Sequence, residues 1–128
     1  MLSIIAMFLA LSQLPANARV YDMSCVPASG VKSTYRGLEL VQNPVRIKSK
    51  KGTINIDTKR KTGCLGSQRM ALITLAKGIY SLSTIKTPDR IKIKTVLVDV
   101  NNNTFTLTNI KGDGTTAEIS QIYGRCIY

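Results

Sequence analysis

The clearest indication of the fold lies in residues 90–126, which read RIKIKTVLVDVNNNTFTLTNIKGDGTTAEISQIYGRC. Apolar and polar residues alternate there in three successive runs, at residues 90–100, 104–110 and 116–123. Such alternation is typical of half-buried strands. An Asn-rich turn separates the first two runs and a Gly-rich turn separates the last two. The segment therefore predicts an antiparallel meander of three strands.

The middle of the chain extends this β pattern toward the N-terminus. Strands are expected at residues 45–48, 53–58, 70–75 and 79–85, with a turn at Lys51-Gly52. Gly78 lies between the last two runs and favours a hairpin. Leu72, Leu75 and Ile79 also have helical spacing, so a helix over residues 68–83 is the competing interpretation.

The N-terminal third is expected to differ. Residues 27–32 have the composition of a loop. Ser33 is a suitable cap for a short helix that runs to about Val41, although Gly37 disfavours a helix and a strand is the alternative. Pro44 would end either element. We therefore predict an α+β fold, in which a short N-terminal helix packs on a curved antiparallel β-sheet.

The first eighteen residues form a separate unit of the sequence. They contain no charged side chain, and an apolar run over residues 2–11 is followed by Pro15 and by Ala16-Asn17-Ala18. This is the pattern of a secretory signal peptide with an A-x-A cleavage site. An uncleaved anchor is the alternative, although the run is shorter than the roughly 20 residues that span a bilayer. We expect a signal peptide at residues 1–18 and a single mature domain at residues 19–128.

The three cysteines suit a secreted protein. Cys25 and Cys126 lie close to the two ends of the expected mature domain, which favours a disulfide between them. In the chain-entropy account, closing a loop of about 100 residues stabilises the fold by roughly 4–5 kcal/mol. For Cys64 we expect a buried free thiol, with pairing to another chain or to one of the end cysteines as alternatives.

The sequence lacks the residues of the common catalytic sites. It has no histidine, which is the usual general acid or base at neutral pH and the commonest metal ligand. Its seven carboxylates show no spacing typical of a glycosidase pair or a calcium loop. Cys64 lacks the histidine base that activates a thiol nucleophile. We expect no enzymatic activity, no cofactor and no metal.

Positive charge is the main functional signal. Eighteen Lys and Arg residues against seven Asp and Glu residues give a net charge of +11. Within expected strands the basic side chains share one face. The candidate binding surface consists of Arg46, Lys48, Lys50, Lys51, Lys59, Arg60, Lys61, Arg90, Lys92 and Lys94.

Such a surface suits RNA phosphates or an acidic protein. The alternative is that these residues are the solvated face of amphipathic strands, where lysine opposes edge-to-edge aggregation. Only two Phe and five Tyr residues are aromatic, so electrostatic recognition is favoured over base-specific stacking.

Both ends of the expected mature domain resemble a known group of proteins. The start, RVYDMSC at residues 19–25, places an aromatic residue shortly before a cysteine. The end, residues 95–126, gives strand, Asn-rich turn, strand, Gly-rich turn, strand and cysteine. Together they resemble the guanyl-specific fungal ribonucleases and, more closely, the RNase-like secreted effectors of powdery mildew fungi. Three residues separate Tyr21 from Cys25, however, rather than the single residue of the effectors' Y-x-C start.

The resemblance implies a role in a plant host. It implies a microbial ribonuclease-like α+β fold, secretion and delivery into the host cell cytoplasm. Such effectors suppress immunity by engaging host proteins or RNA, and plant immune receptors recognise some of them as avirulence proteins. The active ribonucleases use a histidine acid, and no histidine is present here to take that role. We therefore expect a monomeric, catalytically inactive effector that binds no membrane, with weak, salt-sensitive RNA binding and no RNA cleavage.

Three other functions stay open. Residues 69–78 look like the central hairpin of enterotoxin B subunits with an OB fold, but that family needs a long helix afterwards, where residues 87–100 are expected to form a strand. A periplasmic lysozyme-blocking barrel would carry the wrong charge, since like charges oppose association with a cationic lysozyme. An active ribonuclease with an unusual acid is the third alternative.

Overall fold

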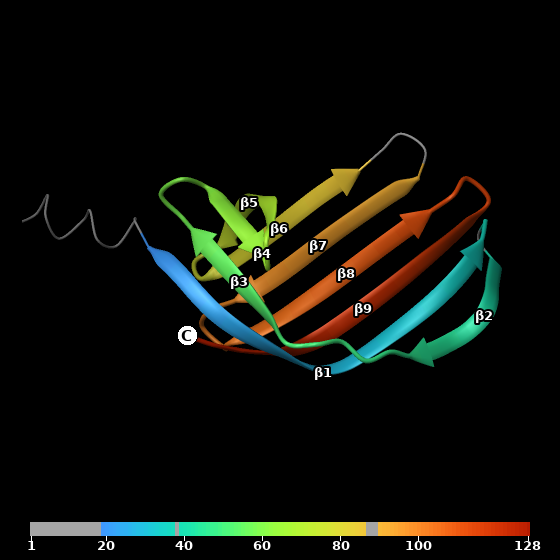
Figure 1. Cartoon of the computed structure of the whole chain (residues 1–128), viewed down its shortest axis with the longest axis horizontal. Helices are drawn as coiled ribbons and strands as arrows, with labels where there is room; N and C mark the ends of the chain where they lie inside the picture. Colours follow the sequence, from blue (N-terminus) through green and yellow to red (C-terminus); the bar gives the residue numbers. More distant parts are fainter. Residues whose placement is uncertain (1–18, 38, 87–89) are drawn as a thin grey trace, which may run out of the picture.

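The structure, a computed structural model, describes residues 19–37, 39–86 and 90–128. These residues form nine strands and no helix (Figure 1). The strands are β1 (Val20–Arg36), β2 (Glu39–Arg46), β3 (Gly52–Asp57), β4 (Thr62–Leu65), β5 (Gln68–Ala76), β6 (Ile79–Lys86), β7 (Ile91–Asp99), β8 (Thr104–Gly112) and β9 (Thr116–Ile127). The expected signal peptide at residues 1–18 lies outside the described residues.

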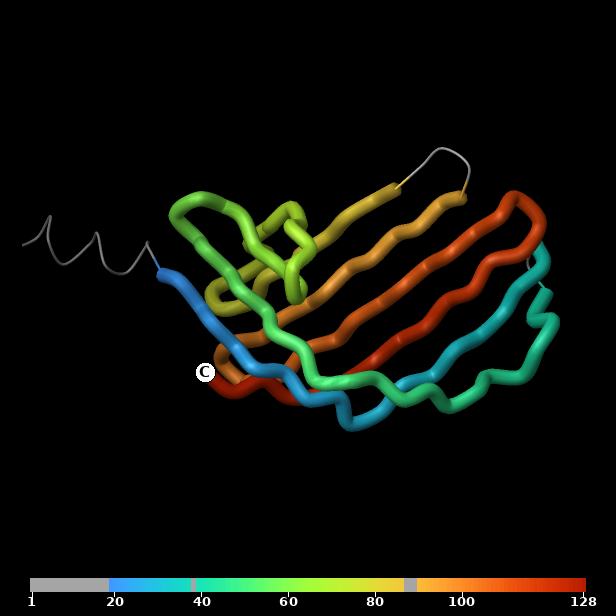
Figure 2. The backbone as a smooth tube through the Cα atoms, in the orientation of Figure 1, coloured from blue at the N-terminus to red at the C-terminus, as the bar shows by residue number. Residues whose placement is uncertain are grey.

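All nine strands belong to one antiparallel sheet that closes on itself. The strand order is β2-β1-β3-β4-β5-β6-β7-β8-β9, and β1 also pairs with β9. Eight strands therefore form a barrel. The remaining strand, β2, is an edge strand that pairs with β1 (Figure 2).

The length of β1 explains this arrangement. One edge of its 17 residues pairs with β9 over residues 24–36. The other edge pairs first with β3, over residues 20–25, and then with β2, over residues 31–36. Where the chain passes from β2 to β3, the amide of Ile47 donates a hydrogen bond of 3.0 Å to the carbonyl of Gly30.

The prediction of an α+β, ribonuclease-like fold is wrong, because the described residues contain no helix. Of the region expected to be helical, residues 33–36 belong to β1 and residues 39–41 to β2, and these two strands pair with each other. Gly37, which follows β1, has a φ of +63°, a left-handed conformation that suits glycine and interrupts a right-handed helix. The β-branched Thr34 and the aromatic Tyr35 also favour a strand.

Three smaller expectations are also wrong. Residues 27–32 lie inside β1, where a bulge between Pro27 and Ser29 interrupts the ladder with β9 and so accommodates the proline. Pro44 does not end its strand, because β2 is an edge strand and Pro44 forms no pair with β1. Lys51-Gly52 is not a turn, since Gly52 begins β3 and pairs with Cys25.

The C-terminal meander and the central hairpin are confirmed. Strands β7, β8 and β9 follow one another as direct antiparallel neighbours. Strands β5 and β6 form the hairpin, and Gly78 has a φ of +81° in its turn. The enterotoxin alternative required a long helix after this hairpin, and β7 occupies residues 91–99 instead.

Apolar side chains fill the middle of the barrel. The largest fully buried ones are Ile54, Ile56, Leu82, Val96 and Val98. They occupy alternate positions along β3, β6 and β7, as expected when one face of each strand points inward. The predicted disulfide between Cys25 and Cys126 is confirmed: the two residues are direct cross-strand partners, so the bond joins the first strand to the last.

Candidate anion-binding site

Three lysines lie side by side at one end of the barrel interior. Lys92 on β7 is the direct cross-strand partner of Lys86 on β6 and of Lys111 on β8. Side chains alternate between the two faces of a strand, so Lys92 lies on the same inward face as the buried Val96 and Val98. All three lysines are exposed, so the inward face changes from apolar to cationic at this end.

A polar row lies between these lysines and the apolar core. Lys94 pairs in register with Thr84 on β6 and Asn109 on β8. It is half-buried, and its Nζ donates a hydrogen bond of 3.3 Å to Oε1 of Gln68 on β5. This bond holds a fourth ammonium group next to the lysine row.

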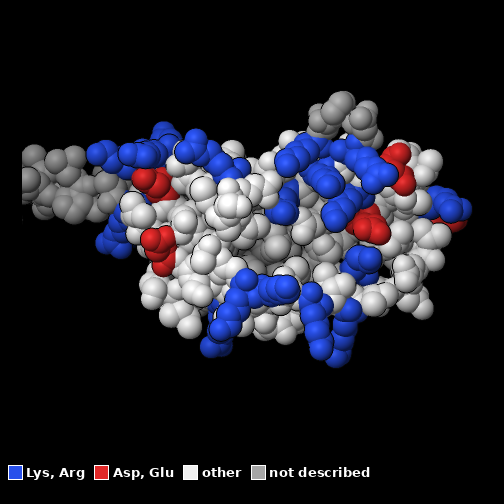
Figure 3. All heavy atoms as spheres, in the orientation of Figure 1, with Lys and Arg blue, Asp and Glu red and all other residues white. Residues whose placement is uncertain are grey.

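These residues line a hollow in the surface. A cavity of about 400 Å³ is lined by Gln68, Thr84, Lys86, Lys92, Ile93, Lys94, Asn109, Ile110 and Lys111. A second cavity of about 310 Å³ shares Lys92 and Lys111 and extends to Arg90. Figure 3 shows Lys and Arg side chains on both sides of a hollow in this face. We call Lys86, Arg90, Lys92, Lys94 and Lys111 the basic end of the barrel.

Like charges are concentrated at the basic end. Neighbouring strands lie about 4.7–4.9 Å apart, so the ammonium groups of direct partners repel each other. Within the described parts of the chain, no carboxylate forms an ion pair with any of the five cations. An anion that entered the cavity would therefore reduce a repulsion that the folded protein otherwise retains.

Two carboxylates border the second cavity, but each already has partners. Glu118 is the register partner of Lys111, yet it forms its ion pair with Lys32 on β1, with 3.8 Å between Oε1 and Nζ. Asp113 accepts hydrogen bonds from the amides and hydroxyls of Thr115 and Thr116, and these bonds hold its pKa well below the ordinary value. Neither acid neutralises the lysine row.

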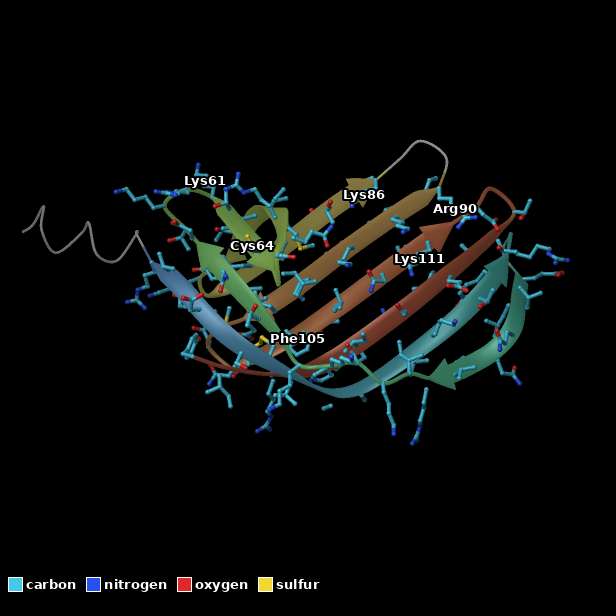
Figure 4. The ribbon with its side chains drawn as sticks, viewed as in Figure 1. Lys61, Cys64, Lys86, Arg90, Phe105 and Lys111 are labelled. Carbon is cyan, nitrogen blue, oxygen red and sulfur yellow. A yellow bond between two sulfur atoms is a disulfide. The ribbon has the colours of Figure 1, made fainter. Side chains whose placement is uncertain are left out.

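The basic residues predicted from the sequence divide into three groups. Arg90, Lys92 and Lys94 belong to the basic end. Arg46 ends β2, and Lys48, Lys50 and Lys51 follow it in the connection to β3, so Arg46, Lys48 and Lys50 do not share a strand face as expected. Lys59, Arg60 and Lys61 lie in the turn between β3 and β4, and Figure 4 places Lys61 far from Lys86 and Lys111. The turn between β3 and β4 is therefore separate from the basic end.

Sequence reasoning missed Lys86 and Lys111. Each lies on a different strand from Lys92, and only the register of two hairpins brings the three together. The signal was present in the Asn-rich turn: pairing Asp99 with Thr104 across it places Lys92 opposite Lys111.

The prediction for Cys64 is confirmed in part. Cys64 is a free thiol on β4, half-buried rather than buried. Across residues 19–37, 39–86 and 90–128, no group of acidic residues and cysteines is placed to hold a metal ion. The same residues include no helix of the length and hydrophobicity needed to cross a membrane.

No family model, no curated protein and no solved structure matches this chain. The resemblance to RNase-like effectors therefore stays a prediction from the sequence, and the fold that it implied is contradicted. The site must be interpreted from its own chemistry.

Proposed function

We propose that the protein is a non-catalytic binding protein whose basic end holds the phosphate groups of a single-stranded RNA segment. The observation that carries the proposal is the row formed by Lys86, Lys92 and Lys111, three cations on adjacent strands that form no ion pair with a carboxylate among the described residues. Phosphates neutralise such a row and release counterions, which favours binding.

The composition of the cavity favours an RNA backbone as the partner. Thr84, Asn109 and Gln68 place uncharged hydrogen-bonding groups beside the lysines, and such groups contact phosphate and sugar oxygens. No aromatic side chain lines either of the two cavities at this end, among the residues that the structure describes. Recognition would therefore be electrostatic and largely independent of the base sequence.

The wider role that we propose is that of a secreted effector. It would act in a plant cell by binding host RNA or protein to suppress immunity, and a plant immune receptor would be able to detect it. The support is the signal-peptide pattern of residues 1–18, the disulfide between the first and last strands, and the absence of histidine. This proposal no longer includes a ribonuclease fold.

The test measures binding of a short labelled single-stranded RNA by fluorescence anisotropy at several salt concentrations. We expect weak binding that decreases steeply as salt rises, without RNA cleavage. The double variant Lys92→Ala/Lys111→Ala should lose about tenfold in affinity. Its slope of log affinity against log salt should be shallower by about 1.4, twice the ~0.7 expected for each phosphate contact.

The matched control is Lys59→Ala/Lys61→Ala, which removes the same charge from the β3–β4 turn. It should retain most of the affinity. An equal loss in both double variants would show that only net charge matters and would refute a site at the basic end. Binding of an acidic peptide, without binding of RNA, would refute RNA as the partner.

A further inference from the structure

Another cavity, separate from the two at the basic end and different in its chemistry, lies at the opposite end of the barrel interior. Its volume is about 610 Å³. Strand β6 connects the two ends, since Tyr80 near its start lines this cavity and Lys86 at its end belongs to the basic end. We call this cavity the tyrosine end; its main lining residues are Arg19, Tyr21, Thr58, Lys77, Tyr80 and Tyr128.

Three tyrosines form one wall of the cavity. The ring centroids of Tyr21 and Tyr80 lie 5.8 Å apart, and those of Tyr21 and Tyr128 lie 5.9 Å apart. Tyr80 is 8% exposed, whereas Tyr128 is 60% exposed. Burial raises the pKa of both Tyr80 and Tyr128, so their hydroxyls remain protonated at neutral pH. The wall thus offers the exposed ring of Tyr128, on which a flat ligand can stack, together with neutral tyrosine hydroxyl groups.

The charged lining residues are cationic. Arg19 and Lys77 line the cavity, and no carboxylate side chain among the described residues does. Asp99 is close enough to raise the pKa of Tyr128. Its carboxylate, however, accepts hydrogen bonds from the amides of Asn101 and Asn102 and from the side chain of Asn102. The cavity therefore favours an anion.

Hydrogen bonds between distant parts of the chain fix the rim. The amide of Arg19 donates to Oγ1 of Thr58 at 2.8 Å, and the side chain of Asn101 donates to the carbonyl of Lys77 at 3.0 Å. The hydroxyl of Tyr128 donates to the carbonyl of Val100 at 2.6 Å. A cavity already held open in this way costs a ligand little ordering of the protein.

We propose that the tyrosine end binds a mononucleotide, with its planar base against the tyrosine rings and its phosphate held by Arg19 and Lys77. Bases stack on aromatic side chains regardless of their identity, and the volume lies within the range of about 300–1,000 Å³ common for small-molecule sites. The site is separate from the basic end and does not depend on RNA binding there.

The test uses titration calorimetry together with intrinsic fluorescence. Three of the five tyrosines line the cavity and the chain has no tryptophan, so tyrosine emission reports on this site. The probes are adenosine monophosphate, guanosine monophosphate, adenosine and ribose 5-phosphate. We expect both nucleotides to bind and to change the emission, and adenosine and ribose 5-phosphate each to bind at least tenfold more weakly.

Two variants locate the binding. Tyr128→Ala removes the exposed ring, and its matched control is Tyr123→Ala, which removes an exposed ring from β9 outside the cavity. Lys77→Ala removes one cation but keeps the backbone carbonyl that accepts the hydrogen bond from Asn101, so the rim is retained. This variant tests the site even if Tyr128→Ala disturbs folding. Tyr128→Ala and Lys77→Ala should each weaken nucleotide binding at least tenfold, and Tyr123→Ala should not.

Three results would refute the proposal: no binding of either nucleotide, unchanged affinity in Lys77→Ala, or equal affinity for nucleotide and ribose 5-phosphate. Loss of nucleotide binding in Lys92→Ala/Lys111→Ala with retention in Lys77→Ala would assign the ligand to the basic end instead. RNA binding at the basic end can succeed or fail independently of each of these results.

Discussion

At the scale of single residues, two aspartates shape the turns of the C-terminal meander. Asp99 accepts hydrogen bonds from Asn101 and Asn102 in the β7–β8 turn. Asp113 accepts four hydrogen bonds from Thr115 and Thr116 in the β8–β9 turn. These bonds need the ionised carboxylates, and they lower the pKa of both residues.

The lowered pKa of Asp113 predicts a dependence of stability on pH. Its contribution is fully present above the ordinary pKa of 3.8 and is lost as the pH falls toward the lower pKa of the folded state. Asp113→Asn should lower the unfolding midpoint at pH 7 and flatten the decline in stability below pH ~4. Denaturant unfolding at several pH values measures both effects.

The control for this variant is Asp22→Asn on β1, which removes the same charge. In this control, the decline in stability below pH ~4 should be close to that of the unmodified protein. If Asp113→Asn and the unmodified protein lost stability in parallel below pH ~4, the turn would not depend on the ionised carboxylate.

At the scale of strands, the sequence predicted those elements that the alternation of apolar and polar residues within a single strand reveals. Alternating residues in β7 and β8 gave the meander, and Gly78 gave the β5–β6 hairpin. The sequence failed at β1, because the loop-like composition of residues 27–32 is accommodated by a bulge and by pairing along both edges of that strand. Such pairing is a tertiary property that local composition does not report.

The same limit applies to the candidate site. Lys92 and Lys94 were predicted together because they alternate within one strand. Lys86 and Lys111 were missed because their proximity to Lys92 depends on register across two hairpins. Conversely, Arg46, Lys48 and Lys50 were grouped on an expected strand that ends at Arg46.

The lysine row also predicts that a change which stabilises the folded protein will weaken its binding of RNA. Lys92→Glu would replace two like-charge pairs, with Lys86 and Lys111, by two opposite-charge pairs. Since cross-strand pairs contribute roughly 0.2–1 kcal/mol each, the variant should be more stable by about 1 kcal/mol while losing RNA affinity. Thermal unfolding at low salt measures the gain, which added salt should reduce.

Lys59→Glu, in the β3–β4 turn, makes the same charge change away from the row. It should produce a smaller gain in stability and a smaller loss of RNA affinity. A Lys92→Glu variant that unfolds at a lower temperature than the unmodified protein would show that the lysines do not repel one another in the folded state.

At the scale of the whole molecule, an apolar core separates two cationic ends that differ in their other lining residues. The basic end offers ammonium groups around its cavity, and the tyrosine end adds aromatic rings around a larger one. The disulfide between Cys25 and Cys126 joins β1 to β9, where the barrel closes. The tyrosine end depends directly on this closure, because Tyr21 lies on β1 and Tyr128 follows β9.

Removal of the disulfide should therefore affect the whole molecule. Cys25→Ala/Cys126→Ala should lose roughly 4–5 kcal/mol of unfolding free energy, since the bond closes a loop of about 100 residues. Cys64→Ala should change stability much less, because its thiol is free and half-buried. Folded yield and denaturant unfolding of the two variants give the comparison. A double variant as stable as the unmodified protein would mean that the bond contributes little to the fold.

The pairing of β1 with β9 also constrains the order of events during synthesis. The ribosome makes β1 first and β9 last, and the two are separated by 101 positions at their cysteines. One edge of the long strand β1 therefore waits unpaired until β9 has been synthesised. Contacts of such wide sequence separation form slowly, and an unpaired strand edge invites association with other chains. Nascent copies of this protein consequently need protection from one another until the last strand arrives.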